Sequence, residues 1–349
     1  MFAATTLAYP CVLALLCTGA GLLVDRLSGS GLALALLPAI GAATLIGVSQ
    51  LTTHFSAAAP ATPYVLAAVA LVGFGAGWPR LLALAGAWRW ERRATGAHAR
   101  TRARARPASR READPGPREQ ASTRALWQVG IAVFVYIAAL APVLAAGRPT
   151  FSSFQALTDS AFHMLGADHL MRHGQDYAGL DLSNSYGQYL KAYYPTGYPS
   201  GADTLFGGSS FLVGLPLIWT FQPFNAFMLA TAVGPALVLS RRMGLAGAWS
   251  ALAAVTAILG ALVYGYELVA SIKEIVALAM ILTLGALTVQ NARWLWRRPA
   301  GVASFALVLA AGVSALGVGF GAWGLAAVSV VAVAAIGDVR AGRARAGRL

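Results

Sequence analysis

The residues best suited to chemistry gather in one polar stretch of an otherwise apolar chain, from Arg148 to Asp203. Asp159 and His163 stand four residues apart, which places two side chains on one face of a helix. Such a pair can act as a general base with its orienting partner, or as two ligands to a divalent cation such as Mg²⁺ or Mn²⁺. The same spacing also occurs where an acid caps a helix and a histidine hydrogen-bonds locally, so both interpretations stay open.

A helix is predicted around this pair, from Ser153 to His173, because Gly174 provides a helix end and the apolar positions form a partial stripe. Gly166 falls near the face of the pair and leaves room there for a ligand. Asp168 points to the opposite side of this helix, and His169 is intermediate. These two residues are supporting candidates for the site.

Two later elements could complete a pocket. The stretch 193–201 holds two prolines and two glycines, which fix an irregular backbone, and its Tyr194 and Tyr198 suit the level of lipid headgroups. Lys273 and Glu274 begin a later apolar run, where they could bind a phosphate or form a structural pair at a helix end. The tyrosine turn could equally be an aromatic belt leading into the next helix.

The elements that must position these residues are membrane helices. The chain is 58% hydrophobic and 11% charged, against about 25% charged residues in soluble domains. Apolar runs recur at the length of about 20 residues that crosses a bilayer. The predicted fold class is therefore an all-α polytopic transmembrane protein with nine spans. The spans are predicted at about 8–24, 31–51, 62–79, 126–146, 222–240, 245–266, 271–290, 301–317 and 320–337.

Other features refine this fold. The stretch 205–220 is apolar but short and broken by glycine and proline, so it is predicted to be an interfacial or re-entrant helix of the outer loop. Gly41 and Gly47 would permit close helix packing. The predicted domains are a three-span module at 1–88, a basic disordered cytoplasmic linker at 89–125, and a six-span module at 126–349 with an outer loop at 147–221.

Charge sets the predicted orientation. With nine spans, every arginine cluster falls on one side, which the positive-inside rule assigns to the cytoplasm. The N-terminus is then outside and the C-terminus cytoplasmic. Both lysines and seven of the thirteen acids fall outside. These acids are Asp159, Asp168, Asp176, Asp181, Asp203, Glu267 and Glu274. The net charge of +13 is attributed to this topology and to anionic lipid headgroups at the linker, with no nucleic-acid partner.

In their order along the chain, these elements resemble the GT-C superfamily of integral membrane glycosyltransferases, which take sugars from polyprenyl-phosphate donors. The resemblance covers about 126–300, and each motif is short. The matching residues are Asp159, His163, Leu170 and Gly174; Tyr194-Pro195-Thr196-Gly197; and Lys273-Glu274. The chain departs from the family pattern in having three spans before the loop, and Ser160 where many members carry a second acid.

The resemblance implies an enzyme that transfers a sugar from a polyprenyl-phosphate donor at the outer face of the plasma membrane. The high alanine, glycine and arginine content is typical of a bacterium with a GC-rich genome, so this would be a bacterial plasma membrane. Asp159 would activate the acceptor hydroxyl. His163, Asp168, His169, Lys273 and Glu274 would support the donor phosphate or a metal. The alternatives are a non-catalytic membrane transport or lipid-binding protein and a partner in cell-envelope assembly.

Overall fold

A computed structural model describes residues 1–102, 117–151, 158–295 and 299–346, without the side chains of 83–102, 117–125, 158–159, 291–295, 299 and 341–346. Every regular element within these ranges is helical. The helices are α1 (Tyr9–Ser28), α2 (Leu37–His54), α3 (Thr62–Arg102), α4 (Pro117–Ala139), α5 (Ala141–Ala146), α6 (Thr158–His173), α7 (Ser185–Tyr193), α8 (Gly201–Val213), α9 (Leu217–Arg242), α10 (Gly247–Ile258), α11 (Ala261–Leu268), α12 (Ile272–Leu295), α13 (Val302–Leu316) and α14 (Gly321–Ala346). Shorter turns are π-helical η1 (Ala4–Ala8) and the 3-10 turns η2 (Leu34–Leu36), η3 (Ala59–Ala61), η4 (Tyr194–Thr196), η5 (Pro299–Gly301) and η6 (Gly317–Phe320).

Six described helical segments are long and apolar enough to cross a bilayer, and a bent pair makes a seventh if it counts as one span. The six are Ala4–Ser28, Leu34–His54, Ala59–Leu82, Leu217–Arg242, Ile272–Gln290 and Val302–Arg340, and the pair joins α10 to α11 with a bend of 45°. The chain is thus an all-helical protein with the composition of a multi-pass membrane protein. The nine predicted spans differ because the apolar part of α4, Leu126–Ala139, is short, and because α13, η6 and α14 count as one segment.

The surface of these segments supports a lipid environment. Large apolar side chains are exposed on α3, α4 and α14, including Leu71, Phe134, Trp323 and Val333. Soluble monomers rarely expose contiguous apolar surface on this scale. These faces therefore suit contact with hydrocarbon.

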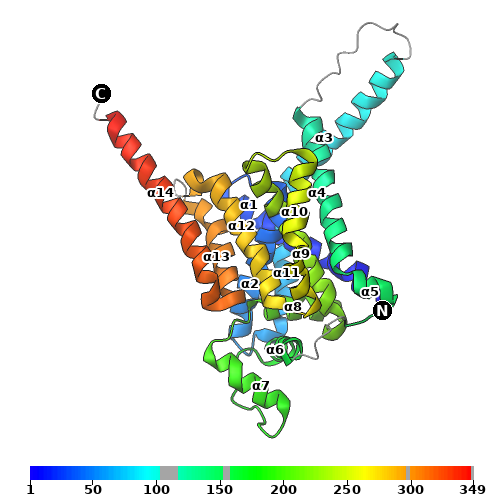
Figure 1. Cartoon of the computed structure of the whole chain (residues 1–349), viewed down its shortest axis with the longest axis vertical. Coiled ribbons are helices and arrows are strands. Elements are labelled where there is room, and N and C mark those ends of the chain that lie inside the picture. The colour runs from blue at the N-terminus through cyan, green and yellow to red at the C-terminus, as the bar shows by residue number, and fades with distance from the viewer. Residues whose placement is uncertain (103–116, 152–157, 296–298, 347–349) are drawn as a thin grey trace.

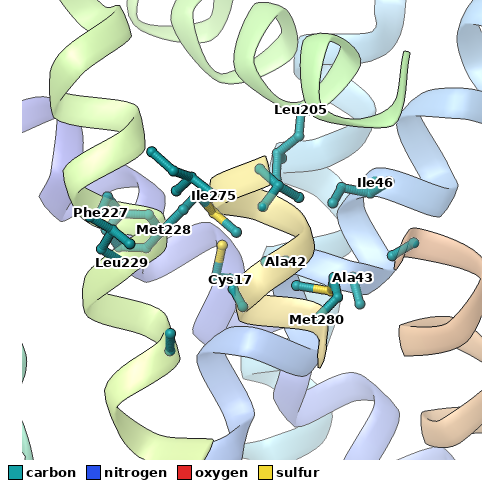
Figure 2. Packing of buried hydrophobic residues seen from close by; sticks show 14 of the residues in the cluster. Cys17, Ala42, Ala43, Ile46, Leu205, Phe227, Met228, Leu229, Ile275 and Met280 are labelled. Carbon is teal, nitrogen blue, oxygen red and sulfur yellow. The ribbon is translucent and has the colours of Figure 1, made fainter. Parts of the chain in front are cut away.

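The interior is one large apolar cluster that joins both halves of the chain. Figure 2 shows Cys17 of α1 packed near Met228 of α9 and Met280 of α12. A Cβ on Gly41 would collide with the backbone of Cys17, so the prediction of close packing is confirmed there. The same prediction is wrong for Gly47, because no atom outside its own helix lies within 4 Å of the Cβ position.

The two ends of the helical body differ (Figure 1). The outer parts of α3 and α14 project from one end, and α6 and α7 lie at the opposite end. The described helices reach into the predicted linker, because α3 continues to Arg102 and α4 begins at Pro117. The remainder of that linker lies outside the described residues.

The apolar stretch after the tyrosine turn forms α8, which ends at Val213, and the prediction of an interfacial or re-entrant helix at 205–220 stays a prediction. The first ten residues of α8, 201–210, are all buried. This helix packs against α6 on one side and against α2 and α3 on others. It lies inside the protein because its glycines allow close approach: a Cβ on Gly207 would crowd the backbone of Ala167 in α6.

Candidate functional site

A buried carboxylate joins three elements at the α6 end of the molecule. Asp203, in the first turn of α8, has no exposed surface. His163 Nδ1 lies 2.8 Å from its Oδ1, and the Tyr194 hydroxyl donates to its Oδ2 at 2.7 Å. The positive end of the α8 helix dipole favours a negative charge at this position. Asp203 therefore fixes both α6 and η4 to the start of α8.

The second nitrogen of His163 has a different environment. His163 is 1% exposed, and its Nε2 is buried without a hydrogen-bond partner. When Nδ1–H donates to the Asp203 carboxylate, the lone pair of the neutral imidazole lies on Nε2. An acid-oriented histidine with a free Nε2 lone pair can accept a proton from a hydroxyl group. Asp203, 40 residues away in the chain, is thus an orienting carboxylate for His163.

Tyr194 occupies the space that the sequence assigned to a ligand. A Cβ on Gly166 would collide with the Tyr194 hydroxyl, so Gly166 accommodates this ring and does not leave an open site. The ring also stacks on Phe162, with centroids 4.9 Å apart and planes 25° apart. Burial, and then the charge of Asp203, raise the pKa of Tyr194 well above its usual value, so this phenol stays protonated.

A second polar contact brings the start of α12 to the tyrosine turn. Lys273 Nζ donates to the Tyr198 hydroxyl at 2.7 Å, and it lies 4.0 Å from Glu274 Oε1. The Tyr198 ring lies 6.0 Å from the His163 ring and 5.8 Å from the Tyr194 ring, measured between centroids. Four of the predicted site residues thus form one cluster: His163, Tyr194, Tyr198 and Lys273.

A polar cavity of about 550 Å³ adjoins this cluster. It is lined by Gln50, Gln175, Tyr177, Tyr194, Pro195, Gly197, Tyr198, Pro199, Ser200 and Ser314. Ligand sites in proteins commonly measure 300–1,000 Å³ and combine aromatic walls with a few polar groups. The lining comes from α2, the segments on both sides of α7, and α13, so the cavity depends on the tertiary fold.

The remaining predicted residues lie apart from this cavity or are described only in part. Asp168 pairs with Arg172 of its own helix at 2.9 Å, on the outside of α6. His169 bonds to the Tyr186 hydroxyl at 3.2 Å and to the Asp176 carbonyl at 2.8 Å. Asp159 lies in the first turn of α6, but its side chain lies outside the described residues.

The pKa of His169 is lowered from its ordinary value, chiefly because burial disfavours the charged imidazole. Its ring stacks on Tyr177, whose centroid lies 5.1 Å away. Tyr177 also lines the cavity. His169 is therefore a packing residue behind one wall of the cavity.

Asp159 and His163 were predicted as possible metal ligands, but the described part of the chain places no complete set of ligands around them. No group of three or more histidine, cysteine, aspartate or glutamate side chains there could hold a metal ion. Asp203 Oδ1 engages the Nδ1 of His163, which leaves only Nε2 for a ligand.

Sequence reasoning missed Asp203, Gln50 and Tyr177 as site residues. Asp203 carried a signal, since it is an acid that directly precedes a long apolar stretch and follows the tyrosine turn. An acid at such a boundary must be either solvated or paired with a specific partner. Gln50 carried no such signal, because a single glutamine near the end of a predicted span is unremarkable in sequence.

Comparison with known proteins gives no further indication. No protein-family model, no curated protein and no solved structure matches the chain. The function is therefore inferred from the residues and their geometry.

Proposed function

We propose that this protein is a membrane glycosyltransferase that moves a sugar from a polyprenyl-phosphate donor to an acceptor at the outer face of the plasma membrane. The observation that carries the proposal is the tyrosine-walled polar cavity, which Lys273 reaches through Tyr198. The proposal includes nine spans, with the N-terminus outside and the cavity at the outer face.

The cavity has the chemistry that a sugar requires. The flat faces of Tyr177 and Tyr198 can pack against the C–H face of a sugar ring. Gln175 and Ser314 provide donors and acceptors for hydroxyl groups. Gln50 Nε2 already donates to Ser200 Oγ at 3.0 Å, so this part of the wall is fixed before a ligand binds.

Lys273 is proposed to hold the donor phosphate. It is the second residue of α12, where the helix dipole adds to its charge. Positive charge at this point would stabilise the phosphate as it leaves. The chain's other lysine, Lys191, is exposed on α7 and lines no described cavity.

In the proposed reaction, the acceptor hydroxyl oxygen bonds to the anomeric carbon as the bond from that carbon to the phosphate oxygen breaks. The hydroxyl proton passes to Asp159, and polyprenyl phosphate leaves as an anion. A carboxylate suffices as the base because the phosphate is already a good leaving group. His163, oriented by Asp203, is buried behind this region and does not line the cavity.

The experiment is transfer of radiolabelled sugar from polyprenyl-phosphate donors in membranes that contain the wild type or a variant. We expect transfer by the wild type, loss in Asp159→Asn, and at least a tenfold loss in Lys273→Met. Lys191→Met and Asp181→Asn are the matched controls and should retain activity, because both residues are exposed. No transfer from any donor, or equal losses in Lys273→Met and Lys191→Met, would contradict the proposal.

One observation favours a second candidate, lipid binding without catalysis. A largely apolar cavity of about 630 Å³ lies between α1, α4 and α9, with Leu7, Val133 and Phe227 in its lining. If it holds a lipid chain, the purified wild type should retain lipid in native mass spectrometry. Ala230→Trp should displace this lipid, because Ala230 lines the cavity, whereas Ala192→Trp on the exposed face of α7 should not.

A further inference from the structure

A buried carboxyl group away from the candidate site has no conventional partner. Glu267, near the end of α11, is 1% exposed, and Asn225 of α9 is fully buried beside it. Neither oxygen of the Glu267 carboxyl group makes a hydrogen bond of good geometry, and neither does the oxygen or nitrogen of the Asn225 amide. The Glu267 carboxyl group and the Asn225 amide thus lie beside each other at the α9–α11 interface, each with buried polar atoms.

An ionised carboxylate is unsuited to this position. No lysine, arginine or histidine among the described residues forms an ion pair with Glu267. An unpaired charge in a protein interior carries a large desolvation cost, so the group either becomes neutral or acquires a cation. In a membrane protein, a buried ionisable group of this kind indicates a specific role.

The chemistry of the neighbouring amide decides between these outcomes. A carboxylic acid has one O–H donor and one carbonyl acceptor, and an amide has N–H donors and one carbonyl acceptor. The two groups can therefore form a ring of two hydrogen bonds that satisfies all four atoms. A metal ion here would lack further ligands, because no group of three or more histidine, cysteine, aspartate or glutamate side chains among the described residues could hold one.

The other polar groups around Glu267 are compatible with a neutral acid. Tyr136 of α4 and Tyr264 of α11 lie close enough to interact electrostatically with Glu267. Neither phenol carries a positive charge that could pair with an ionised carboxylate. On α12, which packs against α11, Lys273 donates to Tyr198 and lies beside Glu274.

We propose that Glu267 and Asn225 form a proton-binding site, in which Glu267 is a neutral carboxylic acid paired with the Asn225 amide. This proposal does not rest on the proposed sugar transfer. A short turn at Ala270 separates Glu267 from Lys273 of the candidate site. The Ala270 N–H donates to the Glu267 carbonyl at 3.1 Å, and Ala270 is buried with a φ of 58°.

A left-handed conformation at alanine is strained, so it persists only where surrounding contacts hold it. This strained turn joins Glu267 to Lys273, six residues later. Loss of the proton would place a charge at the α9–α11 interface and weaken the packing that holds the turn.

Infrared spectroscopy tests the protonation state directly. We expect the purified wild type at neutral pH to show the carbonyl stretching band of a protonated carboxylic acid. Glu267→Gln should lose this band, and Glu274→Gln, the matched control on α12, should keep it. Asn225→Leu should shift the band, because the acid loses its hydrogen-bonded partner.

A second measurement needs no variant. Dicyclohexylcarbodiimide enters apolar regions and reacts with protonated carboxyl groups. The acid proton moves to a carbodiimide nitrogen, the carboxyl oxygen bonds to the central carbon, and the adduct rearranges to a stable N-acylurea. Peptide mapping of the wild type should place this adduct on Glu267. A spectrum without a Glu267-dependent acid band, together with no adduct on Glu267, would overturn the proposal.

Discussion

His163 Nδ1 lies 2.8 Å from Asp203 Oδ1, and both side chains are buried where α6 crosses the start of α8. This contact links α6, which holds Asp159 and His163, to α8, which sequence reasoning did not include in the site. It gives His163 a defined tautomer, and it makes Asp203 the group on which the local structure depends.

Asp203→Leu should destabilise the protein strongly. The substitution leaves His163 and the Tyr194 hydroxyl buried without an acceptor, and each buried polar group that loses its hydrogen-bond partner costs about 1–3 kcal/mol. Unfolding in detergent, followed by circular dichroism, measures the effect. Asp181→Leu is the control, since Asp181 is exposed and bonds only to nearby residues of its own loop. Equal stability of the two variants would refute this role of Asp203.

Gly166→Ala should displace the Tyr194 ring and separate its hydroxyl from Asp203. The added methyl group would overlap the hydroxyl, and overpacking of this kind costs about 1–3 kcal/mol. Gly179→Ala is the control, because no neighbouring atom lies within 4 Å of its Cβ position. Tyrosine fluorescence and thermal unfolding compare the two. A Gly166→Ala protein as stable as the control would show that the ring moves without cost.

Gly41→Ala should destabilise the packing of α1 on α2, whereas Gly47→Ala should not. The methyl group at 41 would overlap the Cys17 backbone, and a backbone cannot move aside as a side chain can. At 47 the space is open, so alanine should be neutral or add up to about 1 kcal/mol through its higher helix propensity. Thermal unfolding of both variants in one detergent measures the effect. A Gly47→Ala protein less stable than Gly41→Ala would contradict the close packing of α1 on α2 at Gly41.

The packing around His169 should weaken as pH falls. Because burial lowers the pKa of His169 in the folded protein, the unfolded chain binds its proton first. The stability that neutral His169 contributes is complete above the unfolded pKa of about 6.5 and is lost as pH falls toward the folded pKa. Hydrogen exchange at the end of α6 across this range measures it. His169→Gln should flatten the dependence, and an unchanged slope in that variant would assign it to another group.

Several features could be predicted from local sequence alone. A bilayer requires long apolar helices, so the apolar runs that form α1, α2, α9 and α12 could be recognised as spans from their length and composition. The end of α6 was correct because Gly174 adopts a φ of 63°, which glycine tolerates best. Lys273 was correctly placed at a helix start for a similar reason, since helix ends are set by nearby residues.

Tertiary structure decided which side chains meet. Asp203 contacts His163, which lies 40 residues earlier in the chain. The Tyr194 ring fills the space beside Gly166, and Glu267 is buried beside Asn225. None of these contacts follows from helical periodicity, because each depends on how two helices cross and on which small residues let them approach. The sequence by itself determined the membrane helices and a polar region with the chemistry of a site. Only the packing of α8 into the interior decided which residues form that site, because it buries Asp203 against His163 and Tyr194, and a buried carboxylate requires such partners.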